Sequence, residues 1–202
     1  VKEPLVQVMP IERRHIRFHD QLSIPCDPMI GVIGVAPKEG AVPCGTPGSH
    51  GGNMDNTRIR KGSVLYLPVF HEGGLLSIGD VHARMGDGEI MVTGVEISAK
   101  VAVYVEVLKN QTIENPMLED STMVYTIASH EDLEQAIFLA SRDMNQVIQK
   151  QLGLSLEEAG MLMSAVGTLQ FCQVVDPKRT VCFAMPKTIL PSLFSEKNGF
   201  PS

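Results

Sequence analysis

The sequence lacks any apolar run of the roughly 18 residues that a membrane-spanning helix needs. It also does not open with the charged and then apolar segment of a secretory signal. These absences predict a cytoplasmic location with no membrane partner. The chain begins with Val1 instead of Met, and we interpret it as starting inside a longer polypeptide.

Clusters of basic residues are also missing. The 17 Lys and Arg residues are outnumbered by 23 Asp and Glu residues, which gives a formal net charge of −6. Surfaces that bind nucleic acid are basic, so we expect no nucleic-acid partner. With 44% hydrophobic and 20% charged residues over 202 positions, the composition is typical of a globular protein with a sizeable core.

The four cysteines form no close pair of the kind that binds structural zinc, since they lie at positions 26, 44, 172 and 182. A disulfide framework has little support without a secretory signal. We therefore expect free thiols in a reducing compartment.

Several familiar catalytic motifs are absent as well. The sequence has no Gly-x-Ser-x-Gly nucleophile elbow, and its glycine-rich stretch at 38–56 has no Gly-Lys-Ser/Thr of a phosphate-binding loop. A Cys44 nucleophile beside His50 stays open, because sequence does not show whether a base lies close in space. Paired carboxylates for glycoside hydrolysis also stay open. The candidates for that pair are Asp80, Asp87, Glu89 and Glu96.

Apolar runs and period-two alternation predict a β-rich first part of the chain. The runs at 28–37 and 64–70 predict buried strands, and 90–97 is strand-like. The clearest alternation lies at 101–108, where valine occupies every second position, and it predicts a half-buried antiparallel strand.

The last third of the chain contains helix signals. Ser129 is expected to cap an amphipathic helix of about twenty residues that ends at Gly153. Ser155 opens a capping box for a second helix. Strand-like runs at 171–175 and 181–185 follow.

This order of elements predicts a mainly β fold, sandwich-like or barrel-like, with an α+β C-terminal portion. We expect a β-rich catalytic portion at 1–128, which lacks an upstream segment of the full protein. An α+β portion at 129–202 is expected to pack on the same body.

One stretch, residues 78–89, concentrates three carboxylates and a histidine. Asp80 and His82 are two positions apart, so both side chains leave the same face of an extended strand. The Gly-Asp-Gly turn at 86–88 can reverse the chain and bring Glu89 back towards them. Such a set suits zinc or another divalent ion. The alternative interpretation is that these acidic residues only form a turn.

Five short motifs occur in a fixed order in the first half of the chain. They are PMIGVIGVAP at 28–37, GGNMDN at 51–56, LYLPV at 65–69, GDVHA at 79–83 and GDGE at 86–89. Together they resemble the acetamidase/formamidase family, and the resemblance extends from about residue 28 to Lys187. An ordered set is far more specific than any single motif.

The resemblance implies hydrolysis of short linear amides, formamide or acetamide, to ammonia and the carboxylate. It also implies a fold with β-sandwich and barrel-like parts, and a homodimer. Family members carry an additional β-rich N-terminal segment that this chain lacks, so the site within these 202 residues is expected to be incomplete. Thr168 stands where the family pattern has an acidic residue, and the region before residue 28 matches poorly.

The resemblance further implies a metal set of Asp80, His82 and Glu89. Zinc is the favoured ion, with calcium as the alternative because the ligands are rich in oxygen. The metal would polarise the amide carbonyl and lower the pKa of a bound water.

Three other residues receive catalytic roles from the resemblance. Glu96 or Asp55 would take the proton of the water and pass it to the leaving ammonia. Asn53 and the N–H groups of the glycine-rich loop would stabilise the oxyanion.

Two other functions remain open. The first is a non-catalytic β-sandwich with a structural metal or small-ligand site, which a fully caged metal and no amide hydrolysis would favour. The second is a family member that has lost its activity, for which Thr168 and the missing upstream segment are the support.

Overall fold

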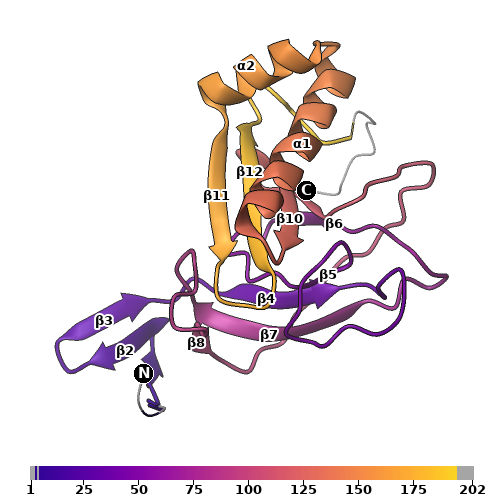
Figure 1. The fold of residues 1–202 in the computed structure, drawn as a ribbon. Helices are drawn as coiled ribbons and strands as arrows, with labels where there is room; N and C mark the ends of the chain where they lie inside the picture. The colour runs from indigo at the N-terminus through magenta and orange to yellow at the C-terminus, as the bar shows by residue number, and fades with distance from the viewer. Residues whose placement is uncertain (1–2, 4, 195–202) are drawn as a thin grey trace.

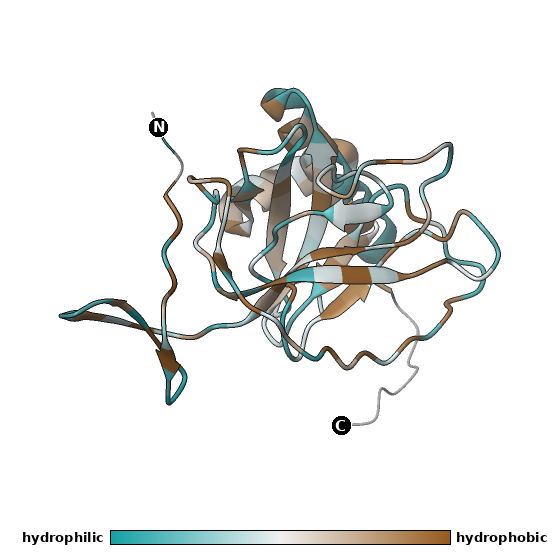
Figure 2. Cartoon of the chain, turned by 90° about the horizontal axis from the view of Figure 1, so that it is seen from below, coloured by the Kyte–Doolittle hydropathy of each residue, from teal (hydrophilic) through white to brown (hydrophobic). Residues whose placement is uncertain are grey.

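The computed structural model describes residue 3 and residues 5–194, which form three antiparallel sheets and two helices. The first sheet has the order β1-β2-β3 and comprises β1 (Ile11–Glu12), β2 (His15–His19) and β3 (Leu22–Pro25). It extends away from the rest of the molecule in both views (Figures 1 and 2).

The second sheet has four strands in the order β5-β4-β7-β8. Its members are β5 (Gly51–Asn53), β4 (Met29–Gly34), β7 (Ser77–Arg84) and β8 (Val95–Glu96). The central strands β4 and β7 pair along most of their length, which confirms the strand expected within 28–37. Much of the 78–89 stretch therefore lies at the middle of a sheet.

The third sheet has five strands in the order β11-β12-β10-β9-β6. Its members are β11 (Thr168–Gln173), β12 (Arg179–Pro186), β10 (Met123–His130), β9 (Met117–Glu119) and β6 (Val64–Tyr66). Strands from both sides of residue 128 thus share one sheet.

Helices α1 (Leu133–Leu152) and α2 (Leu156–Val166) lie beside the third sheet, and α1 packs on β10 and β12 (Figure 1). The buried face of α1 has the spacing of three or four residues that the 3.6-residue period requires. Its apolar members are Ala136, Ala140, Met144 and Ile148. In the described part of the chain, neither helix combines the length and the hydropathy needed to cross a membrane.

The helix ends agree in part with the sequence. The αL residue Gly153 ends α1, and the Ser155–Glu158 capping box opens α2, as predicted. The prediction of Ser129 as the cap of α1 is wrong, because β10 continues to His130 in its pairing with β12. The cap is Asp132, whose carboxylate accepts a hydrogen bond from the backbone N–H of Gln135.

The strand predicted at 101–108 does not form. The four valines at 101, 103, 105 and 107 are between 40% and 65% exposed, and among the described residues no strand pairs with this segment. Alternation yields a strand only where a neighbour satisfies its backbone hydrogen bonds. Of the run at 90–97, only β8 is a strand.

Antiparallel strands still dominate the described chain, and the two helices both belong to the part after residue 128. The predicted fold class, mainly β with an α+β C-terminal portion, is confirmed.

Candidate metal centre

His82 lies at the centre of a group of carboxylates on the four-stranded sheet. Its side chain is buried, and its Nε2 atom is 3.1 Å from Glu96 Oε1, 3.3 Å from Asp80 Oδ1 and 4.0 Å from Asp55 Oδ1. Neither ring nitrogen has a hydrogen-bond partner among the described residues. A buried polar group without a partner is costly, so this imidazole is poised for a ligand.

Strand register brings two of these residues to His82. Glu96 on β8 is the direct cross-strand partner of His82 on β7, a position from which side chains contact each other. Asp80 lies two residues earlier on β7, as the sequence predicted. Gly94 leaves room for the ring, since a Cβ atom at that position would lie 2.6 Å from His82 Nδ1.

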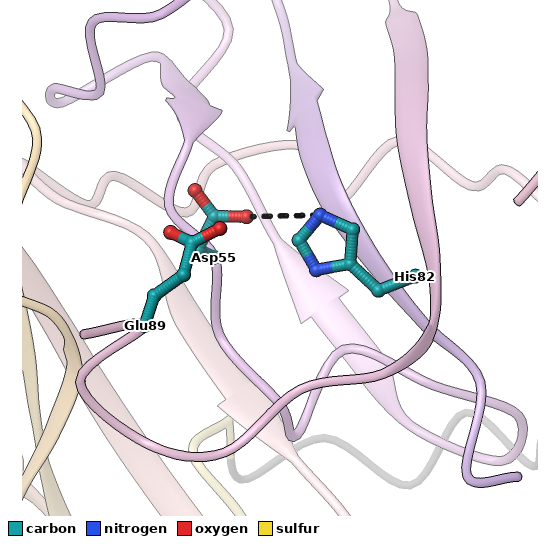
Figure 3. A group of neighbouring side chains, drawn as sticks. All are labelled: Asp55, His82 and Glu89. Atoms are coloured by element: carbon teal, nitrogen blue, oxygen red, sulfur yellow. Dashed lines mark ion pairs between the residues drawn. The ribbon is translucent and has the colours of Figure 1, made fainter. Parts of the chain in front are cut away.

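Asp55 and Glu89 approach the imidazole from two loops (Figure 3). Asp55 follows β5, and Glu89 follows the turn after β7; both side chains are buried. Both residues have positive φ, +44° and +48°, and Asp80 has φ +51°. Non-glycine residues seldom adopt this conformation, and such strain concentrates at functional sites.

Gly31 on β4 provides the space in which two of the carboxylates meet. A Cβ atom there would lie 2.5 Å from Asp80 Oδ2 and even closer to Asp55 Oδ1. The backbone of Gly31 also accepts a hydrogen bond from the Asp55 N–H, at 3.2 Å. The absent side chain is therefore part of the architecture of this site.

Two overlapping sets of potential metal ligands result. Asp55, His82 and Glu89 form one set, and Asp80, His82 and Glu96 form the other; in each set the ligand atoms lie within 4.8 Å of one another. The first set is entirely buried, whereas in the second only His82 is buried. The predicted trio of Asp80, His82 and Glu89 is thus divided between the two sets, and Asp55 and Glu96 join them.

Burial and mutual repulsion change the protonation of the buried set. Burial, then the nearby Glu89 and Asp80 carboxylates, raise the pKa of Asp55 to about 8. Burial, then the Asp176 carboxylate, raise the pKa of Glu89 to about 7. These carboxyls retain protons near neutral pH unless a cation compensates their charge.

Asn53 and Asp176 form the edge of the site. The Asn53 Nδ2 atom donates to Asp176 Oδ2 at 2.8 Å, and Asn53 Oδ1 is buried without a partner among the described residues. Sequence reasoning missed Asp176, because the Asp-Pro pair at 176–177 signals only a turn between two strands. Thr168 begins β11 opposite Ala184 and is exposed.

Comparison with known proteins gives matches to formamidases and acetamidases. The sequence model of the Acetamidase/Formamidase family matches residues 34–190. A formamidase of Methylophilus methylotrophus is 39% identical over 85 residues, which cover 40% of this chain and 21% of that protein. An acetamidase of Mycolicibacterium smegmatis is 41% identical over 64 residues, which cover 31% of this chain and 16% of that protein.

Solved structures extend the similarity over most of the chain. A predicted acetamidase/formamidase from Thermoanaerobacter tengcongensis superposes with a TM-score of 0.89 at 49% identity, covering 92% of this chain and 62% of that one. An acetamidase from Bacillus halodurans gives a TM-score of 0.88 at 43% identity, covering 92% and 63%. This chain therefore spans less than two thirds of the length of the relatives that it matches.

Proposed function

This chain belongs to the acetamidase/formamidase family, and on that premise we propose that it carries the metal centre of a hydrolase acting on short linear amides. Its substrates would be amides such as formamide and acetamide, and its products ammonia and the carboxylate. The names of the relatives, formamidase and acetamidase, support this substrate class. The homodimer, the cytoplasmic location and the division near residue 128 stay predictions.

The metal part of the proposal rests on one observation. The imidazole of His82 is buried, its two nitrogens have no hydrogen-bond partner among the described residues, and it faces carboxylates. Asp55 Oδ1 is likewise buried and without a hydrogen-bond partner among the described residues. A divalent cation would satisfy both atoms and would offset the charge of the neighbouring carboxylates. The residues therefore fit the ion that the family resemblance implies.

We assign Asp55, His82 and Glu89 as the ligands, because their set is the buried one. One nitrogen and carboxylate oxygens suit zinc, and calcium, which prefers oxygen ligands, is the alternative. When bound, the cation would act as a Lewis acid on the amide carbonyl. Asp55, which the family resemblance suggested as a possible general base, is therefore assigned as a metal ligand instead.

Glu96 is our candidate for the general base. Its side chain is half exposed, so water and substrate can reach it, and Thr93 Oγ1 holds its Oε1 atom at 2.9 Å. Partial burial is the largest cause that raises the pKa of Glu96, which brings the carboxylate closer to the range useful for proton transfer at neutral pH. A Glu96 oxygen would accept a proton from the attacking water and deliver it to the departing nitrogen. Asp80, which lies beside Glu96, would orient the Glu96 carboxylate and the His82 imidazole.

The oxyanion role of Asn53 stays a prediction. One hydrogen of its Nδ2 group is donated to Asp176, which leaves the second for a substrate oxygen. The hydrogen bond to Asp176 would also hold the amide in one orientation.

The test is ammonia release from formamide and from acetamide by the full-length protein, with zinc content measured on the same sample. We expect chelation to abolish release and added zinc to restore it. His82→Ala should lose zinc and turnover together, with turnover at least about 100-fold lower, since even residues that only support a ligand have effects of 10–100-fold. The matched control is His19→Ala, which removes an exposed histidine of the N-terminal sheet.

If His82→Ala retains both zinc and turnover, the assigned centre is wrong. Stoichiometric zinc without hydrolysis of either amide would instead favour a non-catalytic metal site.

A further inference from the structure

An ion pair outside the ligand sets connects the two loops that carry Asp55 and Glu89. Arg58 donates through Nη1 to Asp87 Oδ1 at 2.8 Å and through Nη2 to Asp87 Oδ2 at 2.6 Å. Two parallel N–H···O bonds fix both distance and orientation, which single-point ion pairs do not. The Thr57 hydroxyl donates to the same Asp87 Oδ1 at 2.8 Å. The Arg58 side chain is only 15% exposed, whereas that of Asp87 is 42% exposed, so the guanidinium is shielded and the carboxylate is partly open to solvent.

Both partners of the ion pair lie close in sequence to the assigned ligands. Arg58 lies three residues after Asp55, and Asp87 lies two residues before Glu89. Each partner therefore belongs to the same short loop as one of the buried carboxylates. Thr57 and Arg58 of one loop thus both hydrogen-bond the single Asp87 carboxylate of the other loop.

The turn is also attached to the third sheet. The Gly88 N–H donates to the Cys172 carbonyl at 2.8 Å, and the Gly88 carbonyl accepts from the Val174 N–H at 3.2 Å. Arg58 Nη1 reaches the Phe171 carbonyl at 3.5 Å. The ion pair thus lies where both loops meet β11.

The two carboxylates need such an external constraint. Asp55 and Glu89 both have left-handed backbone conformations, which their residue types do not favour. Their side chains are also like-charged when ionised, and they are held close to each other and to one imidazole. Local backbone preference therefore does not keep this arrangement, and charge repulsion opposes it once both carboxyls are ionised to bind a cation.

We propose that the Arg58–Asp87 ion pair is a positioning device that holds Asp55 and Glu89 in place to bind one cation with His82. Arg58 and Asp87 are positioning residues, because neither belongs to a set of potential ligands. This inference rests on the proposed metal centre and adds to it the residues that pre-organise it.

The chain offers a matched control in Arg60 and Asp27. Arg60 Nη1 lies 2.8 Å from Asp27 Oδ2, and the pair also joins distant segments of the chain. It is more exposed, at 45% and 53%, it has a single hydrogen bond, and its partner Asp27 is remote in sequence from every candidate ligand. Removal of either arginine deletes one positive charge and one ion pair with an aspartate, so a difference between them reports on where the pair lies and how well it is shielded.

The experiment measures zinc affinity by competition with a chromophoric chelator, together with the melting temperature of the zinc-free protein. We expect Arg58→Gln and Asp87→Asn each to weaken zinc binding about 10–100-fold, the range for groups that orient metal ligands. Arg60→Gln should stay within about twofold of the unaltered chain. The double variant Arg58→Gln/Asp87→Asn should be no weaker than the weaker single variant, because both changes break one interaction.

A second experiment, in a variant that already lacks one ligand, distinguishes positioning of the ligands from general stabilisation of the fold. Once Glu89→Gln has removed a ligand, Arg58→Gln should cause a much smaller further loss of affinity, whereas general destabilisation would add its full effect. If Arg58→Gln does not fold, Asp87→Asn, which keeps the size of the side chain, replaces it in the same background.

The outcomes separate this inference from the function that it builds on. If the unaltered chain binds zinc and Arg58→Gln and Asp87→Asn bind it as tightly as Arg60→Gln does, only the positioning role is overturned. If the unaltered chain binds no zinc, the proposed metal centre and this inference both fail.

Discussion

Two buried carboxylates of this molecule, Glu119 and Asp55, have opposite surroundings. Glu119 lies on β9 in the five-stranded sheet, and its Oε1 atom accepts hydrogen bonds from the Leu193 N–H at 2.7 Å and the Ser192 hydroxyl at 3.0 Å. Its Oε2 atom pairs with Lys187 Nζ at 2.9 Å. Each oxygen of this carboxylate therefore has a donor, as is usual for buried charge.

Asp55, beside the four-stranded sheet, is more deeply buried than Glu119 but is not satisfied. Its Oδ1 atom has no hydrogen-bond partner among the described residues, and its neighbours include two more carboxylates. The same contrast holds for Asp120, whose pKa is lowered despite its partial burial by hydrogen bonds from Tyr125, Thr122 and Met123. Near the five-stranded sheet the buried acids have donors or a cation, whereas near the four-stranded sheet several carboxylates gather around one imidazole and Asp55 Oδ1 has no partner among the described residues.

The difference shows where the fold is optimised for stability and where it is not. Among the described residues, the buried side-chain atoms without hydrogen-bond partners belong to His82, Asp55 and their neighbours Asn53 and Asn56, and none lies on the five-stranded sheet. Positive φ angles at Asp55, Asp80 and Glu89 add backbone strain at the same place. Local rules that agree with one another specify a fold, and local violations mark function. The acid–imidazole group therefore destabilises the fold locally, and the better-satisfied remainder of the molecule offsets that loss of stability.

The largest change that tests this contrast is a change of pH on the zinc-free protein. Folding raises the pKa of Asp55 to about 8 and of Glu89 to about 7, mainly through burial, from ordinary values of 3.8 and 4.5. Their stabilising contribution is fully present below the ordinary values and is lost as pH rises through the folded values. We expect the free energy of unfolding to fall between pH 5 and pH 9 by an amount on the order of 5 kcal/mol.

Urea denaturation of chelator-treated protein at several pH values measures this fall. Asp55→Asn, which removes the group with the highest of these pKa values, should flatten the profile. Saturating zinc should oppose the fall, because the ligands must lose their protons to bind the metal. A zinc-free profile that rises from pH 5 to pH 9, or that Asp55→Asn leaves unchanged, would contradict the contrast drawn here.

Part of this site was accessible from sequence. Asp80 and His82 are two residues apart on a real strand, so period-two geometry was enough to place them together. The pairing of His82 with Glu96 was not accessible, because it depends on the register of β7 and β8, which is irregular between His82 and Arg84. Asp55 comes from a separate loop with an unusual backbone conformation, and no local pattern signals that.

The fold shows the same division between local and long-range information. The capping box at Ser155 and the αL residue Gly153 are local signals, and both were predicted correctly. The valine alternation at 101–107 is equally clear in sequence, but a strand also needs a partner, and none of the described strands pairs with it. The start of α1 fails for the same reason, because Ser129 belongs to β10 and the pairing of β10 with β12 is not visible in local sequence.

The next largest effect should come from the well-packed region alone. Ile148 on α1 is completely buried among Met144, Ala159 and other apolar residues, far along the chain from every ligand. Ile148→Ala should lower the free energy of unfolding by about 2–5 kcal/mol, the range for such cavity-forming changes. Zinc affinity should stay within about twofold. Denaturation and chelator competition on one preparation measure both, and a comparable loss of zinc affinity would show that the two regions are not separable.

The smallest expected effect is the most specific to the site. Gly31→Ala places a Cβ atom within contact of the Asp55 and Asp80 carboxylates, although it lies on a regular strand with an ordinary φ. The carboxylates are side-chain ends and can move aside, and the third neighbour, the Asp80 carbonyl oxygen at 3.0 Å, needs only a small backbone shift, so we expect the fold to persist. Their displacement should weaken zinc binding about 10–100-fold, or about 1.4–2.8 kcal/mol, as for other changes that misplace ligands.

Gly79→Ala is the matched control, because Gly79 lies on the neighbouring strand β7 and a Cβ atom there meets nothing within 4 Å. Both substitutions have the same intrinsic effect on backbone freedom in a strand, so any difference in zinc affinity must come from the space over Gly31. Equal affinities in the two variants would show that this space is not used by the ligands.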